Sequence, residues 1–168
     1  MKDLLGAKAR GFAEKVHKGQ YRKDRKTPYI EHPKGVVRLL KENNVHEEDI
    51  ICAAWLHDTI EESRGRTNVG ILEQEFNPEI ARIVHLLTRD VGREEYLERI
   101  RGADYAVQII KLADVVHNSS SLFRGIERET VDRLIEDSKK LYLKLAEKIA
   151  PRFYTMIKDN LRPWESFE

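Results

Sequence analysis

The chain has 168 residues, and its 30 Lys and Arg residues nearly balance 29 Asp and Glu residues, for a formal net charge of +1. This length suits one domain over residues 1–168, with a core at about 3–150 and a C-terminal helix and tail at 151–168. The even charge argues against a nucleic acid polymer as partner. The longest apolar run, 50–56, is too short to cross a membrane. With no apolar leader and a single cysteine, Cys52, we expect a cytoplasmic protein.

Apolar residues recur at helical spacing along nearly the whole chain. Pro33 suits the first turn of a helix, and Asn77 precedes Pro78 as a helix cap. No segment alternates as a half-buried strand does, so the expected class is all-α with eight or nine helices. Helices are expected at about 5–19, 33–43, 47–62, 69–76, 78–87, 94–102, 103–118, 130–149 and 153–161, with loops at 21–27, 63–67, 90–93 and 119–129.

Four residues carry metal-ligand chemistry in otherwise apolar helices: His32, the pair His57 and Asp58, and Asp114. Buried charges are costly unless they are paired or bind a metal. Two imidazole nitrogens and two carboxylate oxygens would fill four positions around one divalent cation and leave two for water or substrate. This mixed donor set suits Mn²⁺, Fe²⁺ or Zn²⁺, and spacing alone does not choose among them.

Other polar residues have sequence positions that would surround such a metal. Glu61 follows His57 by four residues, so on a continuous helix it would share that face and could hold or deprotonate a water molecule. Asn118 lies one turn beyond Asp114 and could hydrogen-bond a substrate. Arg22 and Lys23 precede His32 in a basic loop, where they would favour a phosphate ester.

Each of these residues also has an ordinary structural explanation. Asp114 could be the buried partner of an arginine, Glu61 a solvated helix end, and Arg22 and Lys23 a solvated loop. His117 is ambiguous, although a place in the core or behind the metal ligands suits it better than ligation. Taken together, the order of His, His-Asp and a distant Asp in an apolar helix would rarely occur by chance, so we prefer the metal site to these separate structural explanations.

Three segments resemble a known family. The order His32, His57-Asp58 and Asp114 is similar to that of the HD-domain metal-dependent phosphohydrolases. The segments 17–33 (HKGQYRKDRKTPYIEHP), 53–63 (AAWLHDTIEES) and 109–118 (IIKLADVVHN) resemble the hydrolase domain of RelA/SpoT-type enzymes. Within that group, the chain is similar to the single-domain small alarmone hydrolases, including the metazoan SpoT homologue type.

The resemblance implies an HD-domain helical bundle that removes pyrophosphate from the 3′ position of guanosine tetra- or pentaphosphate (ppGpp, pppGpp), usually with Mn²⁺. It implies His32, His57, Asp58 and Asp114 as metal ligands, and Glu61 with Glu62 as the acidic pair that activates water. By the same resemblance, Arg22 and Lys23 would pack around guanine, Asn118 would face the ribose and phosphates, and Arg89 would face phosphate.

The sequence departs from the family pattern at three places. Glu62 stands where the family usually has Asp, and one added methylene displaces a carboxylate by about 1 Å. Ser119, Ser120 and Ser121 replace an apolar residue, Arg and Thr, which removes a positive charge expected at the pocket wall. The basic loop is also one residue longer than in the bifunctional enzymes, and no synthetase segment follows, so synthesis of the alarmone is not expected.

The sequence therefore predicts a metal-dependent hydrolase that acts on a small nucleotide of the ppGpp type, as in the stringent response. The alternatives are an HD-domain enzyme for another nucleotide, such as a 5′-nucleotidase or a dinucleotide cofactor phosphatase, and a nucleotide-binding module without turnover. A purely structural helical protein fits the charged residues least. The sequence leaves open whether the chain forms a homo-oligomer.

Overall fold

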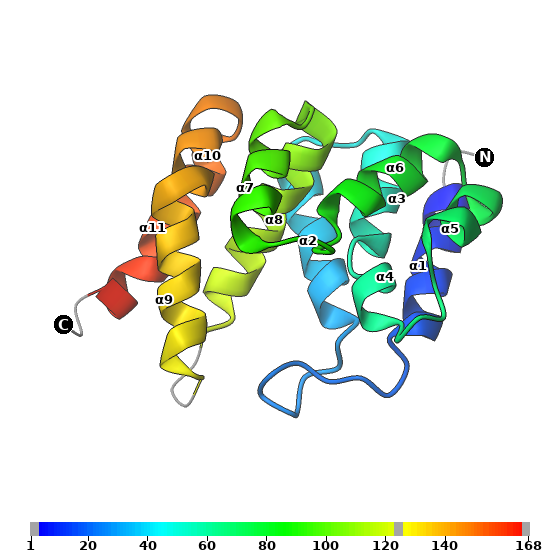
Figure 1. Ribbon diagram of the computed structural model, residues 1–168, viewed down its shortest axis with the longest axis horizontal. Coiled ribbons are helices and arrows are strands. Elements are labelled where there is room, and N and C mark those ends of the chain that lie inside the picture. The colour runs from blue at the N-terminus through cyan, green and yellow to red at the C-terminus, as the bar shows by residue number, and fades with distance from the viewer. Residues whose placement is uncertain (1–3, 123–125, 166–168) are drawn as a thin grey trace.

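The computed structural model describes residues 4–122 and 126–165, and within these ranges the chain is helical with no named strand (Figure 1). The described helices are α1 (Leu4–Val16), α2 (Glu31–Glu42), α3 (Glu48–Leu56), α4 (Thr59–Glu62), α5 (Val69–Glu75), α6 (Pro78–Leu87), α7 (Arg93–Gly102), α8 (Tyr105–Ser120), α9 (Arg128–Asp137), the π-helical turn η1 (Ser138–Tyr142), α10 (Leu143–Ile149) and α11 (Pro151–Glu165). If α3 and α4 are taken together, and α9, η1 and α10 together, the described part of the chain has nine helices. The all-α prediction is confirmed.

Several helix ends lie where the sequence places them. The Asn77 side chain accepts a hydrogen bond from the Ile80 amide at the start of α6, and Pro78 occupies the first turn. Asn68 and Asp104 cap α5 and α8 in the same way. These side chains satisfy backbone N–H groups that have no partner within the helix.

The expected helix at 47–62 is interrupted at His57 and Asp58, which separate α3 from α4. The Thr59 hydroxyl donates to the carbonyl oxygen of Leu56 at 2.7 Å, and His57 Nδ1 lies 2.8 Å from the carbonyl oxygen of Ala54. Such side-chain bonds compete with backbone amides for helix carbonyls. The prediction that Glu61 shares one continuous helical face with His57 was therefore wrong, although Glu61 still lies close by.

The expected long helix at 130–149 also departs from regular α geometry. Its middle turn, Ser138–Tyr142, is π-helical, so one residue more than usual fits into it. Ser138 and Tyr142 are both buried there, and Tyr142 packs its ring near the ammonium group of Lys111 on α8, with Nζ 5.7 Å from the ring centre. The periodicity of the sequence does not reveal this extra residue.

The helices pack around α8, α2 and α3, each of which buries a run of side chains. α2 contacts α3 and α8, α3 also contacts α1 and α6, and α11 packs against α8 and α10. In Figure 1, α9, α10 and α11 form one side of the molecule, and α1 and α5 lie on the other. Because the central helices are held from both sides, polar side chains placed on them have fixed positions.

The segment between α1 and α2 is a loop at the foot of the molecule in Figure 1. Its two limbs meet in a single β-bridge between Tyr21 and Pro28, and Asp24 organises the turn between them. One Asp24 carboxylate oxygen accepts from the amides of Lys26 and Thr27, each at 2.9 Å. The Thr27 hydroxyl donates to the other carboxylate oxygen at 2.6 Å. This bond first, and then the two amide bonds, lower the pKa of Asp24 to about 2.

Part of the loop expected at 119–129, residues 123–125, lies outside the described residues, as do 1–3 and 166–168. Within the described part of the chain, no helix has the length and apolar character needed to cross a membrane.

Candidate functional site

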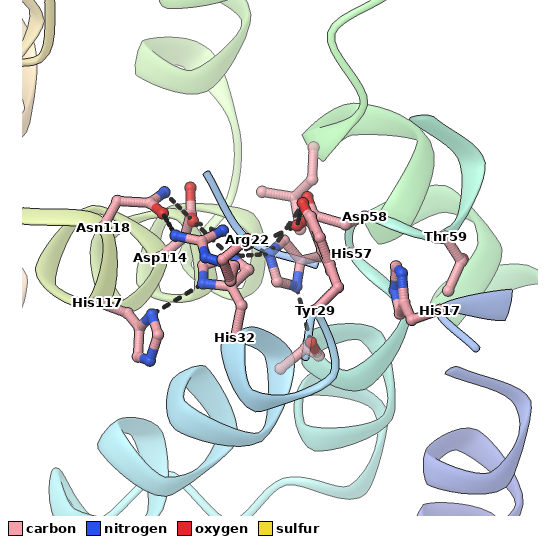
Figure 2. A network of polar contacts seen from close by, with 12 residues as sticks. His17, Arg22, Tyr29, His32, His57, Asp58, Thr59, Asp114, His117 and Asn118 are labelled. Carbon is pink, nitrogen blue, oxygen red and sulfur yellow. Dashed lines mark hydrogen bonds and ion pairs between the residues drawn. The ribbon is translucent and has the colours of Figure 1, made fainter. Parts of the chain in front are cut away.

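Four side chains from separate helical segments converge at one point (Figure 2). His32 comes from the first turn of α2, His57 and Asp58 from the break between α3 and α4, and Asp114 from the middle of α8. The Nε2 atoms of His32 and His57 are 3.2 Å apart. Asp114 Oδ1 lies 3.1 Å from His32 Nε2, and Asp58 Oδ2 lies 3.4 Å from the same atom. We use the name metal centre for this candidate site, at which the four residues could hold a cation.

The hydrogen bonds behind the two imidazoles decide what the centre can hold. His57 Nδ1 must donate to the carbonyl oxygen of Ala54, because a carbonyl only accepts, so Nε2 of a neutral ring carries a lone pair. Burial lowers the pKa of His32, which favours the neutral ring there as well. The lone pair of His57 Nε2 and two carboxylates then lie close together, and a cation would reduce their repulsion.

The donor spacing fits a metal of ordinary size. His32, His57 and Asp58 each place one donor atom within 4.8 Å of the others. Adjacent ligands of an octahedral ion at about 2.1 Å lie roughly 3 Å apart, close to the 3.1–3.4 Å between His32 Nε2 and its three neighbours. The residues present therefore fit a divalent cation.

Both aspartates of the metal centre are held as carboxylates. Burial alone would raise the pKa of Asp114, but Lys111, and after it His32, hold that pKa well below the usual range. Lys111 Nζ lies 2.9 Å from Asp114 Oδ2, and Asn118 donates to Oδ1 at 2.6 Å. Burial likewise opposes ionisation of Asp58, yet His57 and His32 lower its pKa.

Glu61 and Glu62 lie beside the metal centre on α4. Both line a small cavity of about 160 Å³ that also contains His32, His57 and Asp58. Desolvation in this cavity, followed by repulsion from Asp58, raises the pKa of the Glu61 carboxyl.

The small cavity adjoins a larger one of about 690 Å³, and the two share lining residues at their junction. The shared side chains are mostly cations or hydrogen-bonding groups: Arg22, His32, Arg89, Lys111, Asp114 and Asn118. The large cavity is lined further by Lys23 in the loop before α2 and by basic residues on α2 and α9. This arrangement can hold a multiply charged anion with one end at the metal centre.

Comparison with known proteins identifies the family. A model of the HD domain matches residues 9–150. The chain belongs to the HD-domain family.

Proteins similar to this HD domain include guanosine-3′,5′-bis(diphosphate) 3′-pyrophosphohydrolase MESH1 of Danio rerio, 36% identical over 67% of this chain and 66% of that protein. The MESH1 of Xenopus tropicalis is 32% identical over 84% of this chain and 80% of its own length. The chain thus spans about two thirds to four fifths of these relatives. A solved structure described as a metazoan ortholog of SpoT superposes with a TM-score of 0.83 at 22% identity, covering 96% of both chains, which shows a shared fold.

The structure brings the expected substrate-binding residues to the cavities. The Arg22 guanidinium donates to Asn118 Oδ1 at 2.7 Å and lies over the ring of Tyr29. Lys23 Nζ donates to the Thr130 hydroxyl at 3.2 Å, which ties the basic loop to α9. Arg89 lines both cavities.

Sequence reasoning assigned no role to two residues that contact the aspartates of the centre. Tyr29 donates to Asp58 Oδ2 at 2.8 Å, and burial followed by Asp58 raises the pKa of its hydroxyl. Lys111 pairs with Asp114. The signal for Lys111 was its charge in an apolar helix, three positions before Asp114. Tyr29 stands three positions before His32.

His117 lies behind the proposed ligand His32, which is one of the two places that the sequence favoured for it. Its Nδ1 atom is 2.9 Å from Nδ1 of His32. Burial, followed by the neighbouring His32 and Arg22, lowers the pKa of His117 to about 4. The HD domain therefore surrounds its metal centre with a second layer of tyrosine, lysine and histidine contacts.

Proposed function

We propose that this HD domain hydrolyses guanosine 3′,5′-bis(diphosphate) and its pentaphosphate analogue, releasing pyrophosphate and GDP or GTP. The supporting observation is the junction between the metal centre and the large basic cavity. One 3′-phosphate would lie at the centre while the rest of the nucleotide occupied the cavity beyond Arg22 and Asn118. Relatives with at least 30% identity bear the name of this pyrophosphohydrolase activity.

His32, His57, Asp58 and Asp114 would hold one divalent metal. We propose Mn²⁺, which the family resemblance implies, although Fe²⁺ and Zn²⁺ accept the same donor types. A divalent ion there supplies a Lewis acid that polarises a phosphoryl oxygen and makes nearby water more acidic. Tyr29 and Lys111 fix the orientation of the two aspartates through the hydrogen bond and ion pair described above.

Glu61 is the proposed base. From its position beside Asp58 it would orient a water molecule and accept a proton as the water oxygen attacks phosphorus, and Glu62 would assist. The electron pair of the broken P–O bond would leave with the 3′ oxygen of the nucleotide, which would take up a proton from water to become the 3′ hydroxyl. Arg22 and Lys23 would pack around guanine, Asn118 would face the ribose and phosphates, and Arg89 would offset negative charge that develops on the phosphate.

The family departures have different consequences in the structure. Glu62 lines the small cavity, so its extra methylene falls where position affects rate. Ser121 lines the large cavity, whereas Ser119 is buried and accepts a hydrogen bond from Asn160 of α11 at 3.0 Å. We propose that Ser121 is the one of these serines that affects nucleotide selection. We also propose that the enzyme is cytoplasmic and that its partner is a small nucleotide.

Product analysis with Mn²⁺ and guanosine tetraphosphate tests the proposal. Mass spectrometry should detect GDP, and a coupled assay should detect pyrophosphate, with no product from the Asp58→Ala variant. Release of orthophosphate alone would contradict the proposal and indicate a nucleotidase or a dinucleotide cofactor phosphatase. Tight nucleotide binding with Mn²⁺ present and no product would instead identify a binding module.

A further inference from the structure

His117 and Gly35 form a contact that the proposed reaction does not use directly. His117 lies on α8, three residues after Asp114, and its ring extends toward α2 (Figure 2). Its Nδ1 atom lies 2.9 Å from Nδ1 of His32, on the side of the His32 ring away from the metal centre. Asp114 and His117 thus approach the same imidazole from opposite sides.

Gly35 is the residue of α2 that lets His117 come this close. A Cβ atom at position 35 would lie 2.2 Å from both Cδ2 and Nε2 of His117. A real side chain there would force the ring to move. Glycine lowers the stability of a helix interior relative to alanine, so its presence in the middle of α2 calls for a packing reason, and the His117 ring is that reason.

The two ligand imidazoles are oriented by different means. His57 stands at the end of α3, where a carbonyl of its own helix, Ala54, accepts the Nδ1 proton. His32 stands in the first turn of α2, and the nearby Tyr29 carbonyl already accepts the His32 backbone amide at 2.9 Å. The atom within hydrogen-bond distance of His32 Nδ1 comes from another helix, and it is Nδ1 of His117.

We infer that His117 is a positioning residue: it accepts the Nδ1 proton of His32 and so leaves Nε2 of His32 as the nitrogen that faces the metal, while Gly35 keeps the space for its ring. In a neutral imidazole one nitrogen carries the proton and the other the lone pair. A bond between two Nδ1 atoms requires one of them to donate. If His32 ligates through Nε2, the donor is His32 and the acceptor is His117. The inference rests on the proposed metal site but not on the identity of the nucleotide.

The test measures binding of Mn²⁺ alone to chelator-treated full-length protein, with free Mn²⁺ followed by electron paramagnetic resonance. Asn and Leu have nearly the same shape, but only Asn places an acceptor oxygen close to the position of Nδ1. We expect His117→Asn to bind Mn²⁺ within about threefold of wild type. His117→Leu should bind about 10- to 100-fold more weakly, the usual loss when the partner of a ligating histidine is removed. His85→Leu, at an exposed histidine of α6, is the matched control.

Gly35→Ala provides a second route that leaves His117 in place. Alanine favours the helix, so an unchanged or higher unfolding temperature combined with weaker Mn²⁺ binding would show that the lost affinity comes from the displaced ring. The asparagine side chain of His117→Asn is shorter than histidine and leaves more room beside position 35. Gly35→Ala should therefore weaken Mn²⁺ binding less in the His117→Asn background than in wild type. Bound Co²⁺, whose visible spectrum reports its ligands, should change its spectrum in His117→Leu and retain it in His117→Asn.

Equal Mn²⁺ affinity for folded His117→Leu and His117→Asn would overturn the inference, as would a Gly35→Ala variant with wild-type affinity and spectrum. If His117→Leu does not fold, the Gly35→Ala comparison decides the question by itself. Because no nucleotide is present, these results are separate from the proposed hydrolysis: wild type that binds Mn²⁺ but leaves guanosine tetraphosphate intact would contradict the reaction and not the role of His117.

Discussion

The metal centre and the large cavity beside it are built in different ways. His32, His57 and Asp114 are 1%, 4% and 7% exposed and lie on or at the ends of helices that pack against one another. Most of their polar atoms already have a protein partner. The large cavity is walled by the loop before α2 and by solvent-facing side chains of α2 and α9. The comparison indicates that the core holds the proposed metal ligands, while the proposed substrate-binding residues lie on a surface that can vary.

The largest effect should come from the centre itself. Asp58→Ala removes a donor that contacts both imidazoles, so we expect loss of bound Mn²⁺ and a fall in kcat of at least about 10³-fold, since a metal contributes several kcal/mol to such reactions. Atomic emission and a pyrophosphate assay measure the two quantities. Asp159→Ala, at an exposed aspartate of α11, is the control. Wild-type metal content in Asp58→Ala would show that the centre is not assembled as described.

A second variant separates the base from the ligands. Glu61→Gln keeps the shape of the side chain and removes its basicity, so kcat should fall about 10²- to 10⁴-fold, the range typical of a lost general base. Mn²⁺ binding should stay at the wild-type level. Glu62→Gln is the matched comparison and should lose less activity. A larger loss in Glu62→Gln than in Glu61→Gln would exchange the roles of the two carboxylates.

The cavity wall should respond through KM instead of metal binding. Arg22→Lys keeps the charge but loses the bond to Asn118 and the planar contact with Tyr29. We expect KM for guanosine tetraphosphate to rise about tenfold, the equivalent of one charge-assisted hydrogen bond, with kcat changed less. Arg25→Lys in the same loop serves as the control. If kcat falls and KM does not, Arg22 acts on the reacting phosphate and the distinction between centre and wall fails there.

The smallest effect should come from Asp24, far out on the same loop. Its folded-state pKa of about 2 is below the value of about 3.9 in an unfolded chain, so its bonds stabilise the loop above pH 4 and are lost as the pH falls toward 2. Asp24→Ala should therefore lower Tm at pH 7 by no more than about 2 °C. The gap between variant and wild type, followed by circular dichroism, should narrow as the pH falls from 4. A gap that widens on acidification would contradict this assignment.

The same contrast explains what the sequence could predict. The all-α class, most helix bounds and the four residues of the centre follow from local patterns, because apolar periodicity marks helices and a charge inside an apolar helix needs a partner. The break at His57 and Asp58 and the π-helical turn at Ser138–Tyr142 depend on single side-chain bonds and on packing between helices, which periodicity does not contain.

Contacts between distant segments were equally hidden. Lys111 with Asp114 lies within one helix and left a visible signal, but the approach of His117 to His32 joins α8 to α2 across 85 positions of sequence. Gly35 received no interpretation from the sequence, because the ring that occupies the space beside it comes from another helix. Ser119, one of the three serines that depart from the family pattern, is buried and supports α11, at the end of a helix that the sequence ended two residues too early.

The π-helical turn has a consequence for insertions and deletions in this chain. A π-helical turn holds one residue more than a regular turn, so deleting one residue within 138–142 would restore α-helix and keep the apolar residues of α10 directed toward α8. A one-residue deletion in the regular turns of α9 would instead rotate α10 by about 100° and turn those residues away from α8. A length change in the exposed residues 64–66 rotates no helix. Homologues that differ in length should therefore gain or lose residues between α4 and α5, or lose one in the π-helical turn, more often than in the regular turns of α9.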